Sequence, residues 1–235
     1  MKENKVQGIA FDLEGTVVDV EAAHHNAHFA TAAEAGVEVN IDNAFRLLPH
    51  FIGGPDSKVM EDIWELSEKK VSPAELLKRK QFHYERLLAT MDVSPRPGFC
   101  SFLAAVKHIG LPVSIGSLTS MVQAKVLLER SGVGAMIGEA NIVLKEHVKN
   151  EKPAPDVFLE TARRMGIDPK NQLVFEDSPR GVQAAIAAGS RAIGMPVYNR
   201  PEAIEPLRKA GVCMLFMTWS EINADTLIRS LSTQQ

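Results

Sequence analysis

Short apolar runs alternate with helix-like segments along this chain, and that alternation constrains the fold more than any other feature. The first run, at residues 6–12 (VQGIAFD), ends on a carboxylate just before a turn that contains Gly-Thr. Similar runs occupy residues 111–115, 172–175, 191–194 and 213–216, and helical patterns occupy residues 122–130, 154–165 and 179–188. Strands that alternate with helices over short connections predict an α/β fold, a doubly wound parallel sheet with helices on both faces.

One long stretch breaks this rhythm. Residues 20–95 contain no convincing strand, and the helix-like patterns there fall at residues 22–35, 56–69 and 72–89. Turn-forming residues, Ser-Pro-Arg-Pro-Gly, follow at 94–98. We therefore expect an α/β core formed by residues 1–19 and 96–235, with residues 20–95 inserted as an all-helical cap domain.

Composition narrows the class of protein. The chain has 26 Lys and Arg against 29 Asp and Glu, and 45% of its residues are hydrophobic. This balance excludes a disordered chain and gives no reason to expect a nucleic acid or an anionic membrane as partner. No apolar run approaches the roughly 20 residues of a membrane span, and the first residues do not resemble a signal peptide. The only cysteines, Cys100 and Cys213, are expected to be buried, reduced thiols in a cytoplasmic protein.

Polar side chains gather where the predicted strands end. Ligands of open parallel sheets bind beyond the carboxyl ends of the strands, so these side chains are expected to converge. They are Asp12 and Glu14 after the first strand, Ser117 after the second, and Glu176 with Asp177 after the third. Carboxylates at one point repel one another unless a cation holds them, and hard oxygen ligands of this type suit Mg²⁺.

Other groups in the same region suit an anion. Ser117 offers a hydroxyl and Lys152 a fixed positive charge, a good pair for phosphate oxygens. Backbone amides of the turn at Gly15 and Thr16 would complete the cradle. Each signal has an ordinary alternative when taken singly: a solvated turn, a surface lysine, or a helix N-cap at residues 176–178. Their joint occurrence in this order favours a phosphate site.

These residues resemble the motifs of the haloacid dehalogenase superfamily. The resemblance rests on FDLEGTVVD at residues 11–19, Ser117, EKPAPDVF at 151–158 and VFEDSPRGVQAA at 174–185. It covers the whole core and looks like the branch that holds β-phosphoglucomutase and small sugar-phosphate phosphatases. A member of this branch is expected to have a Rossmann-like core with a helical cap.

The resemblance implies a role for each motif residue. Asp12 would be the nucleophile, and Glu14 would be general acid and then general base. Mg²⁺ would be held by Asp12, by the backbone carbonyl of Glu14, by Asp177, and by Glu176 directly or through water. Ser117 and Lys152 would hold the phosphoryl oxygens. The family usually has aspartate where this chain has Glu14, and the extra methylene moves the proton donor by on the order of 1 Å.

The cap is expected to carry substrate selectivity. His24 matches a cap histidine that helps to position the acid/base in β-phosphoglucomutase, although His24, His25 and His28 also fit a simple polar helix face. Lys58 lies where the mutases have an arginine and would replace it only as a point charge. Lys78 and Lys80 are expected to belong to a solvated charged face.

The leading hypothesis is a Mg²⁺-dependent phosphatase that hydrolyses a small phosphorylated metabolite, such as a sugar phosphate, through an aspartyl-phosphate. A β-phosphoglucomutase-like phosphomutase is the first alternative, because it would share every core residue. A catalytically silent fold used for binding or regulation is the second. The expected partner is the small metabolite alone, without nucleic acid or membrane, and the expected assembly is a monomer or homodimer.

Overall fold

The computed structural model describes residues 5–233. The chain divides into two compact units, Met1–Asp19 with Ser94–Gln235 and Val20–Val93. We call them the core unit and the helical unit. The second boundary therefore lies two residues before the position expected from the sequence. No helix of the described residues is long and apolar enough to cross a bilayer.

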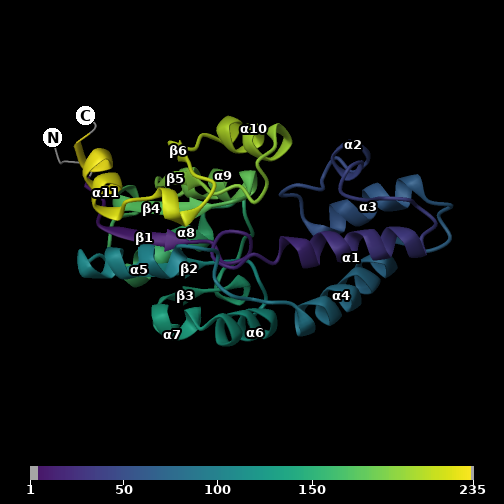
Figure 1. Ribbon diagram of the computed structural model, residues 1–235, viewed down its shortest axis with the longest axis horizontal. Helices are drawn as coiled ribbons and strands as arrows, with labels where there is room; N and C mark the ends of the chain where they lie inside the picture. Colours follow the sequence, from purple (N-terminus) through teal and green to yellow (C-terminus); the bar gives the residue numbers. More distant parts are fainter. Residues whose placement is uncertain (1–4, 234–235) are drawn as a thin grey trace. The chain divides into compact units, whose positions relative to one another are not determined.

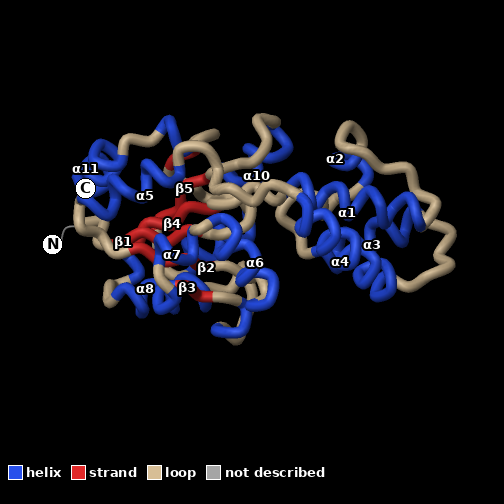
Figure 2. Tube along the Cα trace, turned by 60° about the horizontal axis from the view of Figure 1, so that its bottom comes forward, coloured by secondary structure: helices blue, strands red, loops and turns tan. Residues whose placement is uncertain are grey.

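The core unit contains one sheet. Among residues 5–233, six strands pair in parallel in the order β3-β2-β1-β4-β5-β6 (Figure 2). Their bounds are Gly8–Phe11 (β1), Val113–Gly116 (β2), Ile142–Val143 (β3), Gln172–Glu176 (β4), Arg191–Gly194 (β5) and Met214–Leu215 (β6). This confirms the predicted doubly wound sheet. The edge strand β3 was not expected from the sequence.

Side chains point alternately to the two faces of each strand, so a buried layer forms on each face of the sheet. Phe11 and Phe175 pair in register and turn their rings toward Phe99, Phe102 and Trp219. The side chains of the preceding residues, Ala10 and Val174, point to the opposite face of the sheet. There they belong to a separate buried cluster with residues of α8 and α9. Both faces are therefore buried, as a parallel sheet requires.

Helices follow the strands around the core unit (Figure 1). They are α5 (Phe99–His108), α6 (Met121–Ser131), α7 (Val133–Ile137), α8 (Asp156–Met165), α9 (Pro179–Ala187), α10 (Pro201–Ala210) and α11 (Ala224–Thr233). Short 3-10 turns lie at Glu139–Asn141, Lys145–His147, Pro169–Asn171 and Trp219–Glu221. Helix α5 was not predicted, yet its buried residues Phe99, Phe102, Leu103 and Val106 have helical spacing that the sequence displays.

The helical unit is built differently. Residues 20–93, all of which the structure describes, contain no strand and form four helices. These are α1 (Glu21–Glu34), α2 (Ala44–Leu47), α3 (Asp56–Leu66) and α4 (Pro73–Thr90). Apolar residues of all four helices form its buried core, among them Ala32, Ala44, Ile63 and Leu76.

The thiols differ from expectation. Cys100 and Cys213 are unpaired, but both are exposed rather than buried. Cys100 lies in the first turn of α5, on the side away from the buried Phe99 and Phe102.

Candidate active site

Three candidate residues lie at neighbouring strand ends. Asp12 follows β1, Ser117 follows β2, and Glu176 is the last residue of β4. Because β1 pairs with both β2 and β4, the chain changes direction across the sheet at this point. In open α/β sheets a ligand crevice forms beyond the carboxyl ends of the strands at such a switch point. The candidate active site therefore lies where the topology favours one.

Lys152 joins two of these strand ends. Its ammonium donates to Asp12 Oδ1 at 2.5 Å, to Glu176 Oε1 at 2.6 Å and to the Gly116 carbonyl at 3.2 Å. Lys152, Asp12 and Glu176 are all buried. A buried lysine with two carboxylate partners is held in a defined position, so the fold brings together residues 140 positions apart in the sequence.

Burial and charge perturb both partners of this ion pair. Burial raises the pKa of Asp12 to about 8; Lys152 opposes this change, and the nearby Glu176 carboxylate adds to it. Burial lowers the pKa of Lys152, but the two carboxylates outweigh burial, so this pKa lies above its usual range. One ammonium thus does not offset the carboxylates around it, and an ionised Asp12 requires more positive charge.

Both oxygens of Glu176 already have partners. Oε1 accepts from Lys152, while Oε2 accepts from the backbone N–H and the hydroxyl of Ser178. Its carboxylate also packs against Gly181, where an added Cβ would lie only 1.7 Å from Oε1. Glu176 is therefore fixed by the start of α9, which favours a contact with a cation through water over a direct one.

The loop after β1 contacts Asp177. Gly15 has a φ of +79°, and an added Cβ there would lie 2.3 Å from Asp177 Oδ2. The Thr16 hydroxyl donates to Asp177 Oδ1 at 3.0 Å. The Gly15 amide donates to the Val18 carbonyl at 2.8 Å, so the loop itself already uses one of the amides expected to bind phosphate.

Two residues that the sequence did not single out hold this loop. Arg96 donates to the Gly15 carbonyl at 2.7 Å, and Trp219 Nε1 donates to the Thr16 carbonyl at 3.1 Å. Arg96 also donates to carbonyls after β5 and β6, those of Met195, Pro196 and Met217. The loop backbone is consequently tied to distant strand ends. The sequence places Arg96 in a turn without indicating these bonds.

The hydroxyl of Thr119 was also missed. Thr119 Oγ1 donates to Glu14 Oε1 at 2.6 Å and lies 2.8 Å from the Ser117 hydroxyl oxygen. The glutamate that departs from the family pattern therefore has a specific partner in the loop after β2.

The donor set fits a hard divalent cation better than a transition metal. Within residues 5–233, no three carboxylate, imidazole or thiolate groups form a preformed metal cage. Mg²⁺ does not need one, since it usually keeps several waters and takes one or two protein carboxylates. Asp12 directly after β1 and Asp177 directly after β4 are carboxylates of this kind.

The helical unit contains the other candidates. His24 Nδ1 lies 2.8 Å from Lys80 Nζ, and its ring stacks on Tyr84 with a centroid distance of 4.1 Å. His25 and His28 are buried, so the three histidines do not form a solvated polar face. Lys58 is 48% exposed and pairs with Glu61 across one helix turn.

Lys80 corrects a second expectation. It is fully buried, whereas Lys78 is solvated as predicted. Its ammonium donates to Asp56 Oδ2 at 2.5 Å, and Asp56 Oδ1 lies 2.9 Å from His28 Nε2. The sequence contains the signal for this burial, because Leu76, Lys80, Tyr84 and Leu88 form one buried stripe at four-residue spacing along α4.

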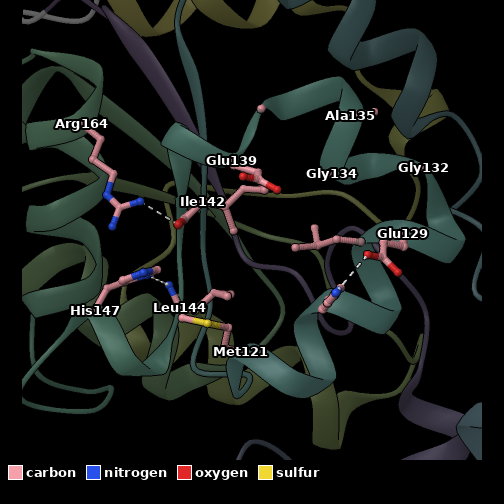
Figure 3. Close-up of a pocket in the computed structure, with 13 residues that line it drawn as sticks. Met121, Glu129, Gly132, Gly134, Ala135, Glu139, Ile142, Leu144, His147 and Arg164 are labelled. Atoms are coloured by element: carbon pink, nitrogen blue, oxygen red, sulfur yellow. Dashed lines mark hydrogen bonds and ion pairs between the residues drawn. The ribbon is translucent and has the colours of Figure 1, made fainter.

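A groove of about 810 Å³ lies elsewhere on the core unit (Figure 3). Residues of α6, α7, α8 and the β3 region line it, including Met121, Leu128, Ile142 and Arg164. None of the candidate catalytic residues is among its lining residues. The groove is thus separate from the cluster around Asp12.

Known proteins resemble this chain in sequence and in fold. Haloacid dehalogenase-like hydrolases match residues 6–189. Fructose-1-phosphate phosphatase YqaB of Escherichia coli is 32% identical over 188 residues, which cover 79% of this chain and 94% of that protein. A haloacid dehalogenase-like protein of Agrobacterium tumefaciens superposes with a TM-score of 0.82 at 24% identity, over 96% and 99% of the two chains. A putative β-phosphoglucomutase of Thermotoga maritima has a TM-score of 0.73 at 24% identity, over 95% and 99%.

The chain therefore belongs to the haloacid dehalogenase-like hydrolases. The matching family is one of hydrolases. The resemblance inferred from the sequence motifs is confirmed.

Proposed function

We propose that the protein is a Mg²⁺-dependent phosphatase that hydrolyses a small phosphorylated sugar or a similar metabolite. The observation that carries the proposal is the buried contact of Lys152 with Asp12 and Glu176 at the switch point of the sheet. The named activity of a relative, fructose-1-phosphate hydrolysis, supports a sugar phosphate as substrate.

Asp12 is the proposed nucleophile. Its carboxylate oxygen attacks phosphorus, a new Asp12 O–P bond forms, and the bond from phosphorus to the sugar oxygen breaks. Lys152 and Ser117 hold the phosphoryl oxygens during this transfer, and the turn at Gly15 and Thr16 borders them. Lys152 also stabilises the ionised form of Asp12 and so opposes burial, which raises the pKa of Asp12.

Glu14 is the proposed acid and base. Its protonated carboxyl donates a proton to the departing sugar oxygen, which leaves as a neutral hydroxyl. The resulting carboxylate then accepts a proton from water, whose oxygen attacks the aspartyl-phosphate and releases Asp12 and inorganic phosphate. The same group thus serves both half-reactions.

Asp12, Asp177 and the Glu14 backbone carbonyl would hold Mg²⁺, with Glu176 acting through water. The bound cation would supply positive charge that favours the ionised nucleophile and offsets the charge of the incoming phosphate. Asp177 is oriented for this role by Thr16, and Glu176 by Ser178.

His24 and Lys58 remain the proposed contributions of the helical unit to substrate selection. His24 has the stronger support, because Lys80 and Tyr84 fix its ring. Lys58 has less, because its exposed pair with Glu61 does not hold it in one position. A cytoplasmic location is also part of the proposal and is supported by the two unpaired cysteines.

Phosphate release from a panel of phosphorylated metabolites, with and without Mg²⁺, tests the proposal. Fructose 1-phosphate, other hexose and pentose phosphates, phosphoglycolate and β-glucose 1-phosphate form the panel. Mg²⁺-dependent release well above the Asp12→Asn background is expected from a sugar phosphate. Conversion of β-glucose 1-phosphate to the 6-phosphate, primed by a bisphosphate, would replace the proposal by the phosphomutase alternative. Inactivity of the folded protein in both assays would favour the catalytically silent alternative.

A further inference from the structure

The side chain of Glu14 is held by a short chain of hydroxyl groups. Thr119 Oγ1 donates to Glu14 Oε1 at 2.6 Å, and Ser117 Oγ lies 2.8 Å from Thr119 Oγ1. The backbone N–H of Thr119 donates to Ser117 Oγ at 3.3 Å. Ser117 and Thr119 are both buried, at 2% and 8% exposure. These contacts lie wholly within the core unit.

The number of protons fixes the direction of this chain. A hydroxyl group has a single hydrogen to donate and can accept through its lone pairs. Since Thr119 gives its hydrogen to Glu14, Thr119 Oγ1 can act only as an acceptor in any hydrogen bond with Ser117. The loop after β2 therefore points a donor at one defined oxygen of Glu14.

We propose that Thr119 is a positioning residue for Glu14, and that it accounts for glutamate at a position where the family usually has aspartate. The inference rests on the proposed function, because it assigns the partner of the proposed acid and base. Thr119 holds Oε1 while Oε2 carries the proton that passes to the sugar oxygen and is later regained from water. An aspartate would be one methylene shorter, so its carboxylate would not reach Thr119 at hydrogen-bond distance.

Loss of this contact affects one chemical requirement selectively. Alkoxide leaving groups need a proton as the P–O bond breaks, whereas a phenolate with strongly electron-withdrawing substituents leaves without one. The quantity that isolates this step is kcat/KM, because it ends with transfer of the phosphoryl group to Asp12 and excludes the later hydrolysis, in which Glu14 is the base for every substrate. A displaced Glu14 would therefore lower kcat/KM for sugar phosphates and leave kcat/KM for aryl phosphates nearly unchanged. A general structural defect would lower both values together.

The test compares Thr119→Val with wild type on the best sugar phosphate and on 4-nitrophenyl phosphate. Valine keeps the shape and removes the hydroxyl. We expect kcat/KM on the sugar phosphate to fall about tenfold or more. We expect kcat/KM on the aryl phosphate to change less than about threefold. Thr119→Ser restores the hydroxyl and should return the sugar phosphate rate to within about threefold of wild type.

Thr161 provides a matched control. It is a buried threonine of the same unit whose hydroxyl donates to Gln172 Oε1 at 2.8 Å, away from the site. Thr161→Val should leave the ratio of the two kcat/KM values unchanged. An equal loss of kcat/KM on both substrates for Thr119→Val, or no loss on either, would overturn the inference.

A double-mutant cycle tests the explanation for glutamate. In a Glu14→Asp background, Thr119→Val should change the sugar phosphate rate less than about twofold, because the shorter side chain no longer contacts Thr119. A full tenfold loss in that background would show that Thr119 acts elsewhere. If wild type releases phosphate but the Thr119 variants keep the wild-type ratio, the inference alone fails. If wild type releases no phosphate from any substrate, the proposed function fails and the inference fails with it.

Discussion

Each unit of this protein buries one lysine against an aspartate, and the two clusters differ in charge balance. Lys152 in the core unit and Lys80 in the helical unit each lie 2.5 Å from a carboxylate oxygen. Lys152 has a second carboxylate partner, Glu176, and Asp177 follows directly in the chain. Lys80 has instead a His24 nitrogen at 2.8 Å and the face of Tyr84 at 4.7 Å.

The difference separates a site with an excess of negative charge from one whose charges are balanced. Burial with excess carboxylate raises the pKa of Asp12 to about 8. In the helical unit burial also acts to raise the pKa of Asp56, but His28 and Lys80 outweigh it and hold that pKa below its usual range. An unbalanced buried cluster at a strand end is typical of a functional site, while a balanced one is explained by stability.

Substitution of Asp12 by asparagine should have the largest effect. It removes the nucleophile, so turnover should fall at least about a thousandfold. The fold should persist, since the folded state favours protonated Asp12 and loses stability as pH rises between about 4 and 8 in the absence of metal. Urea unfolding at pH 8 should thus show the variant to be at least as stable as wild type. Retained turnover would contradict the assignment of Asp12.

Asp177→Asn should have the next largest effect. It removes one charge from the proposed Mg²⁺ site while keeping an acceptor for the Thr16 hydroxyl. We expect the Mg²⁺ concentration for half-maximal activity to rise about 10- to 100-fold, together with a lower maximal rate. Mg²⁺ titrations of phosphate release measure both quantities. An unchanged Mg²⁺ response would remove Asp177 from the proposed metal site.

Strand ends and motif order made much of the core predictable. Asp12, Ser117, Lys152 and Glu176 carry chemistry that a parallel sheet collects at one edge, so their neighbourhood follows from topology. Contacts between loops have no comparable pattern. The Thr119 hydroxyl reaches Glu14 across 105 residues, and no periodicity in the sequence encodes that contact.

Charged helices were harder to interpret. The segment around Lys80 has many charged residues, which favours a solvated face, and Lys78 on the same helix is indeed solvated. Lys80 is buried because Asp56 at the start of α3 and His24 on α1 meet it there. The four-residue spacing of Lys80 from Leu76 and Tyr84, and of Tyr84 from Leu88, indicates burial, whereas the charged composition of the segment does not.

His28 should give the balanced cluster a measurable pH dependence. Burial lowers the pKa of His28 to about 4, against the opposing effect of Asp56. The folded state then binds fewer protons than the unfolded state between about pH 4 and 6.5, so stability falls as pH decreases through that window. The full change is about 3 kcal/mol.

Tryptophan fluorescence can isolate this effect. The chain has one tryptophan in each unit, Trp64 in the helical unit and Trp219 in the core unit. In a Trp219→Phe background, the free energy of unfolding in urea, followed through Trp64 fluorescence, should fall steeply from about pH 6.5 to about pH 4. His28→Gln should reduce this dependence of the free energy on pH. A parallel profile for both proteins would mean that His28 is not the titrating group.

Lys58→Ala should have the smallest effect on stability of these substitutions. The Lys58–Glu61 pair is about half exposed on both sides, so solvent screens it, and the free energy of unfolding should change by less than about 0.5 kcal/mol. Lys70→Ala, which removes a more exposed pair with Glu68 in the same unit, is a suitable control. The substitution also tests function. If Lys58 binds the substrate as a point charge, its removal should raise KM without altering kcat. A rise in KM specific to Lys58→Ala would show that selection of the substrate depends on an exposed cation, whereas equal KM values would leave His24 as the proposed selecting residue of the helical unit.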